Sequence, residues 1–184
     1  TSSDLDFMMH DIGLKANKNV IVYKNYTSLD DTLSFLESLD VPMYKIASFE
    51  LTHIPLIRKV ASTGKPLIMS TGMASQEDIE LAIGTAKQAG AKDIIILKCT
   101  SAYPSTAKDA NLSTIKDMES RFGVQVGLSD HTKGIAAPIV AVGLGAMCIE
   151  KHLCLDRKEK GVDSEFSLEP EEFEILVREV RNAY

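Results

Sequence analysis

Short apolar runs alternate with longer amphipathic segments along most of the chain. The short runs are rich in Val, Ile and Leu and predict buried strands at 19–24, 43–48, 65–70, 92–99, 124–129 and 146–152. The longer segments have apolar residues at helical spacing and predict helices at 28–40, 53–64, 75–90, 112–123, 134–145 and from Glu169 onward. Ser75 and Asp78 form a capping-box pattern at the start of one of these helices, and Gly90 follows its end. This repeated strand–helix order predicts an α/β protein with a parallel sheet.

Polar side chains stand at the C-terminal end of nearly every predicted strand. They are Lys45 and Ser48, Ser70 and Thr71, Lys98 and Thr100, Ser129 with His131, and Glu150 with His152. In a (β/α)8 TIM barrel all of these ends converge on one mouth, where the catalytic residues of the fold lie, whereas in an open sheet they are spread along an edge. The segment "YKNYTS" after the first strand also lacks the glycine-rich turn of open dinucleotide-binding sheets. The pattern therefore favours a barrel.

The barrel is expected to be partial. Six βα units are two fewer than the fold requires, and 184 residues are fewer than the typical about 250. We interpret residues 1–184 as one domain, a partial barrel of about six units that begins near the third strand. Two sheet edges, at 19–24 and 146–152, would then be unpaired, and residues 1–11 have only weak helical spacing. We therefore expect a piece of a longer chain or a self-associating species.

The composition of the chain mainly excludes certain classes of protein and partner. The formal net charge of -6 and the absence of a basic stripe argue against a nucleic-acid partner. The longest apolar stretch, 135–147, is too short and too rich in Gly and Ala to predict a membrane span, and the first residues do not resemble a signal peptide. Cys99, Cys148 and Cys154 have no CxxC spacing, so we expect reduced thiols and a cytoplasmic protein, with Cys99 and Cys148 as core residues.

Two of the four histidines stand at the ends of predicted strands: His152 is the last residue of one, and His131 lies just past the end of its neighbour. Because side chains alternate along a strand, Glu150 and His152 are expected to point into the mouth, while Ile149 and Lys151 point outward. Two imidazoles backed by carboxylates suit Mn²⁺ or a similar divalent ion, although on spacing alone a pair of hydrogen-bonded core histidines is equally acceptable.

Lys45 is a candidate anion ligand because a buried lysine is costly unless it meets an anion. The alternative is a lysine whose stem is buried and whose ammonium reaches solvent at the strand end.

A resemblance follows from six segments in this order: "VPMYKIASFE", "GKPLIMSTGMAS", "LKCTSAYP", "GLSDHT", "IEKH" and "DSEFSLEPEEF". With them, residues 40–184 resemble the sialic acid synthase family, whose members condense phosphoenolpyruvate with an N-acetylated hexose to form nine-carbon sugar acids and release phosphate. "CTSAYP" and the "DSEFSLEPEEF" segment are most similar to the pseudaminic acid synthase branch. N-acetylneuraminate or legionaminate synthesis is the alternative within the family.

The resemblance implies a role for individual residues. His131 and His152 would hold a divalent metal, Mn²⁺ or Mg²⁺, which polarises the sugar aldehyde. The implied substrate-binding residues are Lys45, Ser48, Ser70, Ser101, Tyr103, Ser129 and Asp163, with Tyr103 beside the sugar. The implied catalytic residues are Lys45, Glu50, Glu150 and Asp163, with Glu50 as a proton-transfer group.

The chain also departs from the family pattern. A Ser-Thr-Pro-Phe-like phosphate loop is replaced by "YKNYTS", where Asn25 or Thr27 could take its place. By the resemblance, we expect the first two barrel strands to lie outside residues 1–184. The same is expected of the C-terminal antifreeze-like domain, which in the family reaches over the partner's active site in a domain-swapped homodimer. Residues 1–184 alone are therefore expected to be poorly active.

Two other functions remain open from the residues. One is a metal-free aldolase in which Lys45 or Lys98 forms a Schiff base with the substrate. The other is a non-catalytic barrel that binds only a sugar or a partner chain.

Overall fold

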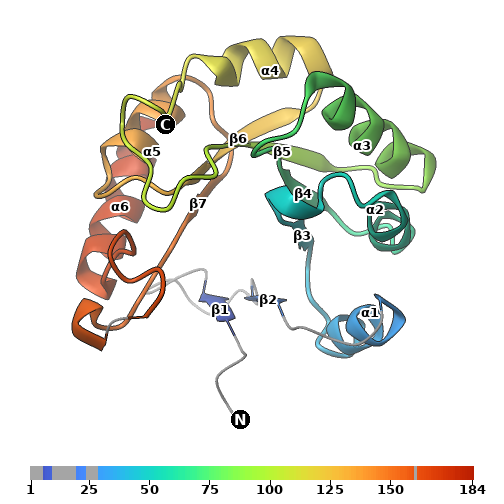
Figure 1. The fold of residues 1–184 in the computed structure, drawn as a ribbon, viewed down its shortest axis with the longest axis horizontal. Helices are drawn as coiled ribbons and strands as arrows, with labels where there is room; N and C mark the ends of the chain where they lie inside the picture. Colours follow the sequence, from blue (N-terminus) through green and yellow to red (C-terminus); the bar gives the residue numbers. More distant parts are fainter. Residues whose placement is uncertain (1–5, 10–19, 24–28, 160) are drawn as a thin grey trace.

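A sheet of five parallel strands forms the centre of the molecule. The computed structural model describes residues 6–9, 20–23, 29–159 and 161–184. The strands follow the sequence order: β3 (Tyr44–Ile46), β4 (Leu67–Ser70), β5 (Ile94–Cys99), β6 (Gln125–Asp130) and β7 (Ile149–Lys151). Each neighbouring pair is joined by a crossover that contains a helix, as parallel pairing requires. The sheet curls into an arc (Figure 1), so the predicted partial barrel is confirmed.

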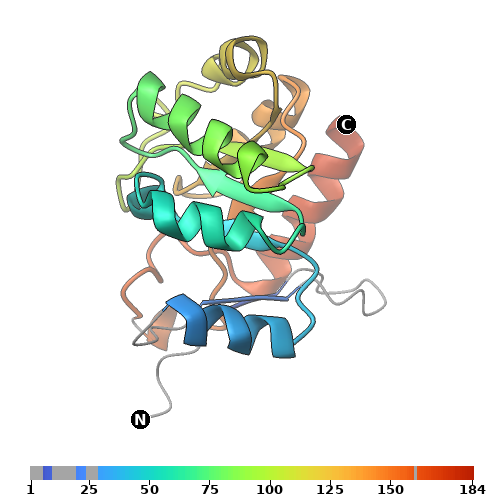
Figure 2. The same ribbon diagram turned by 90° about the vertical axis from the view of Figure 1, so that its right-hand side faces the viewer.

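Helices cover the convex side of this arc. They are α2 (Ile54–Ala61), α3 (Gln76–Gln88), α4 (Thr114–Phe122), α5 (Ala136–Gly143) and α6 (Pro170–Ala183), while α1 (Leu29–Ser38) precedes the sheet. Figure 2 shows α1 to α4 stacked along one side. Two 3-10 helices, η1 (Ser48–Glu50) and η2 (Arg157–Glu159), follow β3 and β7. The predicted capping box is present: Ser75 Oγ accepts from the Asp78 N–H at 3.1 Å, and Asp78 Oδ2 accepts from the Ser75 N–H at 3.0 Å.

The hydrophobic core lies between the sheet and its helices. One row of outward-facing residues crosses four neighbouring strands in register: Ile46, Met69, Ile96 and Val126. All four are buried and pack with apolar residues of α2, α3 and α4. Since side chains alternate along a strand, the intervening residues point to the concave side. The helices therefore cover the convex face of the sheet and leave its concave face as the place for a functional site.

The strand predicted at 19–24 is present, but its predicted place in the parallel sheet is wrong. Val20–Tyr23 forms β2, which pairs antiparallel with β1 (Asp6–Met9) in a separate two-stranded sheet. In the described residues the parallel sheet thus has five strands instead of six, and its first edge is β3. Residues 1–11 were not expected to close the parallel sheet. Their described part, "DFMM", forms β1 and pairs with β2, because such a short apolar run fits a strand as well as a helix.

Candidate active site

The mouth of the partial barrel is formed by the C-terminal ends of β3 to β7 and the loops that follow them. Cys99, Ser129 and Glu150 form one inward-facing row across β5, β6 and β7. Lys45 of β3 reaches the same place, because its Nζ lies 3.2 Å from Glu150 Oε2. Ser129 Oγ donates a hydrogen bond of 2.6 Å to Glu150 Oε1. The structure therefore brings together three of the predicted site residues, from strands at both edges and the interior of the sheet.

Two imidazoles lie next to each other at the same mouth. The ring centroids of His131, after β6, and His152, after β7, are 5.2 Å apart. His131 Nδ1 lies 3.0 Å from the carbonyl oxygen of Thr100. Since a carbonyl only accepts, Nδ1 is the donor in this contact, and Nε2 is the ring nitrogen left for other partners. His152 Nδ1 lies 3.6 Å from Asp163 Oδ2, so a carboxylate stands beside the second imidazole.

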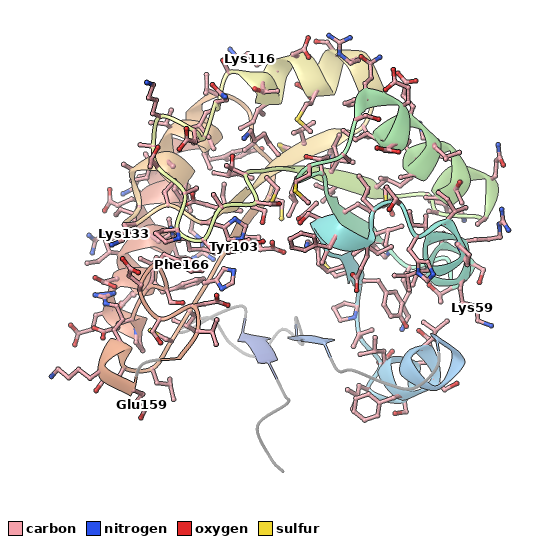
Figure 3. The ribbon with its side chains drawn as sticks, in the orientation of Figure 1. Lys59, Tyr103, Lys116, Lys133, Glu159 and Phe166 are labelled. Carbon is pink, nitrogen blue, oxygen red and sulfur yellow. The ribbon has the colours of Figure 1, made fainter. Side chains whose placement is uncertain are left out.

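Aromatic rings surround the imidazole pair. The Tyr103 ring centroid is 4.4 Å from that of His131, and the Phe166 centroid is 4.9 Å from that of His152. Figure 3 shows Tyr103 and Phe166 close together, although they come from separate loops. Burial raises the pKa of Tyr103, so its hydroxyl stays protonated at neutral pH. Phe166 was not predicted as a site residue, because an apolar side chain inside a quoted motif gives no chemical signal.

Ser48, after β3, and Ser101, after β5, bring their hydroxyl oxygens to 3.2 Å from each other. Gly72 makes this approach possible. It has a φ of +47°, and a Cβ at this position would lie 2.4 Å from Ser48 Cβ and 2.8 Å from Ser101 Oγ. A glycine was not predicted here, but its position directly after the polar end of β4 is the signal that marks it.

Ser70, at the end of β4, has the least satisfied hydroxyl of the site. It is 2% exposed, and its Oγ has no hydrogen-bond partner among the residues that the structure describes. A buried hydroxyl without a partner costs free energy, so Ser70 is suited to donate to a substrate oxygen.

Cys99 was predicted as an ordinary core residue, and the structure gives it a second character. It is buried, but it points toward the mouth within hydrogen-bonding reach of His131, Ser129 and Ser101. Burial raises the pKa of the Cys99 thiol, but the hydrogen bond to His131 and the neighbouring hydroxyls outweigh this, and the pKa falls below its ordinary value. By contrast, burial raises the pKa of Cys148 to about 11.

Three further residues were named as candidates: Glu50, Asn25 and Thr27. Glu50 lies in η1, where its Oε2 accepts a 3.0 Å hydrogen bond from the Ala47 N–H, and it therefore caps this short helix. Asn25 and Thr27, the candidates for the phosphate loop, lie outside the described residues.

Lys98 points away from the mouth. It lies in register with Leu128 on the helix-covered side of the sheet, and its Nζ donates to Thr100 Oγ1 at 2.6 Å. Burial lowers the pKa of Lys98, which favours a nucleophilic amine, but its direction removes it from a substrate in the mouth. Lys45 is paired with Glu150, and a carboxylate favours the ammonium form, which is not a nucleophile. The geometry of the two lysines therefore disfavours the Schiff-base aldolase.

The imidazole pair fits a divalent ion that is completed by other ligands. Within the described part of the chain, no group of three or more His, Cys, Asp and Glu side chains could hold an ion. His131 and His152 supply two nitrogen donors, so water and substrate oxygens would have to occupy the remaining coordination positions. Mn²⁺ accepts such a mixed set of nitrogen and oxygen ligands.

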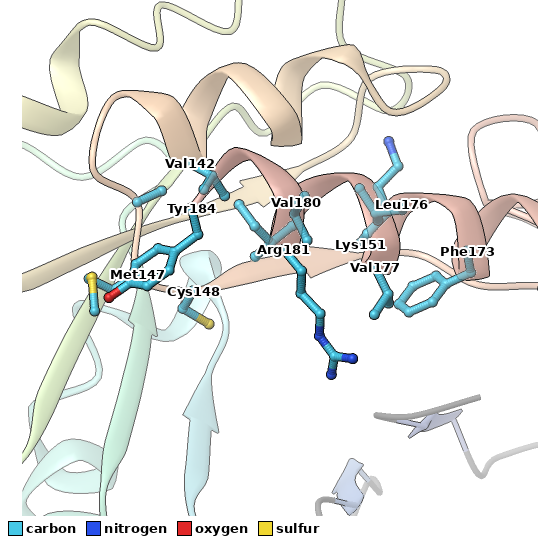
Figure 4. A pocket seen from close by; sticks show the side chains of 12 residues that line it. Val142, Met147, Cys148, Lys151, Phe173, Leu176, Val177, Val180, Arg181 and Tyr184 are labelled. Carbon is cyan, nitrogen blue, oxygen red and sulfur yellow. The ribbon is translucent and has the colours of Figure 1, made fainter. Parts of the chain in front are cut away.

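A pocket of about 320 Å³ lies away from these residues, between β7 and α6 (Figure 4). Its lining is mostly apolar and includes Phe173, Leu176 and Val180 of α6. It contains none of the hydroxyls or imidazoles of the mouth, so we place the candidate site at the mouth.

Fold and mouth together define the class: part of a (β/α)8-barrel protein whose polar residues gather at the C-terminal face of the sheet, as in barrel enzymes. The NeuB family model matches residues 10–184, and the chain belongs to this family. The resemblance to sialic acid synthases is thereby confirmed. No helix among the described residues combines the length and apolar character needed to cross a bilayer.

Named relatives differ in the sugar acid that they make. The chain is 42% identical over 167 residues to a pseudaminic acid synthase of Campylobacter jejuni, covering 91% of this chain and 48% of that protein. It is 36% identical over 181 residues to an N,N'-diacetyllegionaminic acid synthase of the same species, covering 93% and 54%. A crystal structure of N-acetylneuraminic acid synthetase from Leptospira borgpetersenii has a TM-score of 0.80 and 40% identity, covering 83% and 53%. The chain thus spans about half the length of these proteins.

Proposed function

We propose that the full-length protein condenses phosphoenolpyruvate with an N-acetylated amino or diamino hexose, forming a nine-carbon sugar acid and releasing phosphate. The observation that carries this proposal is that a lysine cation and an imidazole pair share one concave surface. Lys45 contacts Glu150 of β7, and His152 follows two residues later, directly after this strand. A trianionic enol phosphate and a sugar aldehyde require these two kinds of group side by side.

The phosphoenolpyruvate half of the site would consist of Lys45 and the surrounding hydroxyls. Lys45 Nζ would exchange its contact with Glu150 for a contact with an anionic oxygen of the substrate. Ser70 Oγ is unpartnered within the described residues and would gain an acceptor. Ser129 and the Ser48–Ser101 pair lie on the same mouth and supply further donors. The site would therefore be arranged for the anion before it binds.

The sugar half would lie at the imidazole pair. His131 and His152 would hold Mn²⁺ or Mg²⁺, which when bound supplies Lewis-acid polarisation of the aldehyde. Tyr103 and Phe166 offer an apolar wall to the sugar ring. Asp163, 3.6 Å from His152, would orient this imidazole and contact the sugar. Glu50 and Glu150 are the proposed proton-transfer carboxylates. The new carbon–carbon bond would join the methylene carbon of phosphoenolpyruvate to the aldehyde carbon, whose oxygen takes up a proton and becomes a hydroxyl. Water would add to the carbon that bears the phosphate, and phosphate leaves as the keto group forms.

Pseudaminic acid is the proposed product, supported by relatives that bear this name at 42% and 45% identity. Legionaminic acid and N-acetylneuraminic acid are the alternatives, because the same chemistry serves all three. A cytoplasmic homodimer is part of the same proposal.

The test is an assay of the full-length gene product with phosphoenolpyruvate, Mn²⁺ and the hexose precursor of each of the three sugar acids. Phosphate release that requires both substrates, with a matching keto acid by mass spectrometry, supports the proposal. Chelation by EDTA should abolish it, and added Mn²⁺ should restore it. Sugar binding without product from any precursor would contradict the synthase and support the non-catalytic barrel.

A further inference from the structure

Asp130 and Lys151 form an ion pair that is almost completely buried. Lys151 Nζ lies 2.7 Å from Asp130 Oδ2, and the two side chains are 1% and 2% exposed. The two residues are direct register partners at the ends of β6 and β7. Lys151 was predicted to point outward. It does leave the mouth, but it ends in this pair and not in solvent.

The pair is part of a closed hydrogen-bonded network. Asp130 Oδ1 accepts from the Thr132 N–H at 3.0 Å, and Oδ2 accepts from Thr132 Oγ1 at 3.1 Å. Lys151 Nζ also donates to the Thr132 carbonyl oxygen. The network thus joins the end of β6, the first turn of the following loop and β7. The aliphatic stem of Lys151 lines the apolar pocket beside α6, as Figure 4 shows.

The network lies directly behind the imidazole pair. Asp130 is the residue before His131, and Lys151 is the residue before His152. Ser129 and Glu150, one residue earlier on each strand, point into the mouth, so Asp130 and Lys151 point to the opposite side. The pair therefore touches neither the mouth nor a substrate within it, but it holds the backbone next to each histidine.

Stability alone does not account for such a pair. The cost of removing two charges from water is large, and apolar replacements of buried ion pairs are often as stable or more stable. What an ion pair with three further hydrogen bonds to Thr132 adds is a defined distance between the two strand ends. We propose that Asp130 and Lys151 are positioning residues that set the separation of His131 and His152. This inference rests on the metal role proposed for the two histidines.

The test uses the double variant Asp130→Asn/Lys151→Met in the full-length protein. Asn keeps one oxygen that accepts from the Thr132 N–H, and its amide can donate to Thr132 Oγ1. Met keeps the aliphatic stem, so the ion pair is removed without leaving a charge buried. The expected result is a Kd for Mn²⁺ raised about 10-fold or more, measured by electron paramagnetic resonance titration, at an unchanged Tm of the metal-free protein. An unchanged Kd would overturn the proposal. If the double variant does not fold, Lys151→Arg decides by the same criterion, because it keeps the charges but lengthens the link.

The control is Lys133→Met/Glu165→Gln, which removes an exposed ion pair of 2.6 Å that starts from the same loop. It should leave the Kd unchanged, and an equal weakening there would also overturn the positioning role. If the wild-type protein binds no divalent ion, the proposed metal function fails. The positioning role is then judged from crystal structures, where a changed His131–His152 separation in the double variant supports it and an unchanged separation overturns it.

Discussion

Lys45 Nζ and Glu150 Oε2 lie 3.2 Å apart, although the two residues belong to the two edge strands of the parallel sheet. In a flat sheet, four strand spacings would separate β3 from β7 by about 19 Å. The curl of the sheet removes this separation and leaves both side chains mostly buried, at 11% and 17% exposure. The contact therefore depends on the barrel curvature, and it places a cation and a carboxylate at the centre of the mouth.

Replacement of Lys45 by Met should weaken phosphoenolpyruvate binding far more than sugar binding. Loss of one member of a buried charge pair costs about 2–5 kcal/mol, and the substrate anion would lose its cation. Isothermal titration with each substrate measures the two losses. Lys92→Met, exposed near the opposite end of β5, is the control and should change neither. Equal losses for both substrates would show that Lys45 is structural.

His131→Ala and His152→Ala should each abolish Mn²⁺ binding and metal-dependent condensation while the fold is retained. Each substitution removes one of the two imidazole donors that the described residues bring to the mouth. Metal titration and circular dichroism measure the two properties separately. His53→Ala is the matched control, because His53 is exposed before α2 and caps no N–H with its side chain. Near-normal turnover of either mouth variant in saturating Mn²⁺ would refute the metal assignment.

Gly72→Ala should disturb the Ser48–Ser101 pair and weaken substrate binding. The new methyl group would overlap Ser48 and Ser101, and the residue would keep an unfavourable positive φ. Gly64→Ala isolates the second effect, since Gly64 has a φ of +73° with no atom within 4 Å of an added Cβ.

Both variants should lose roughly 1–2 kcal/mol of folding free energy from the left-handed backbone. Only Gly72→Ala should raise the KM for phosphoenolpyruvate. A KM that rises equally in both variants would assign the effect to backbone strain.

Acid stability should depend on Glu37. The hydrogen bond from the Tyr44 hydroxyl, and secondarily Lys65, holds the pKa of Glu37 below its ordinary 4.5 against the opposing effect of burial. A carboxyl whose pKa is lower in the folded state stabilises the protein above its unfolded pKa, and this contribution disappears as the pH falls through the folded value.

Glu37→Gln should therefore reduce the free energy of unfolding more at pH 7 than at pH 3, because the contribution shrinks as the pH falls through the lowered pKa. Urea titrations at both pH values measure this difference. Tyr44→Phe should give the same pattern, and the double variant should lose less than the sum of the two. An equal loss at both pH values would exclude this linkage.

The sequence by itself determined the local elements and the order of the chemistry. Apolar runs and helical spacing predicted β3 to β7 and the helices between them. A strand that is buried on both faces is a short apolar run, and a helix that is buried along one stripe has apolar residues every three or four positions, so both patterns are visible within a few residues. Ser75 and Asp78 marked the start of α3 for the same reason, since a cap is a local hydrogen bond. Polar residues at successive strand ends were sufficient to predict the mouth with Lys45 and Glu150, because parallel strands align their C-terminal ends.

Only the tertiary structure decided which distant residues meet. The pairing of β2 with β1 in place of β3 depends on backbone hydrogen bonds between segments whose patterns allow either partner. The burial of Lys151 with Asp130 and the contact of Phe166 with His152 join residues from different strands and loops. The need for Gly72 arises from two serines that come from other loops. Such contacts are set by the curl of the sheet and by side-chain packing, which no periodicity along the chain records.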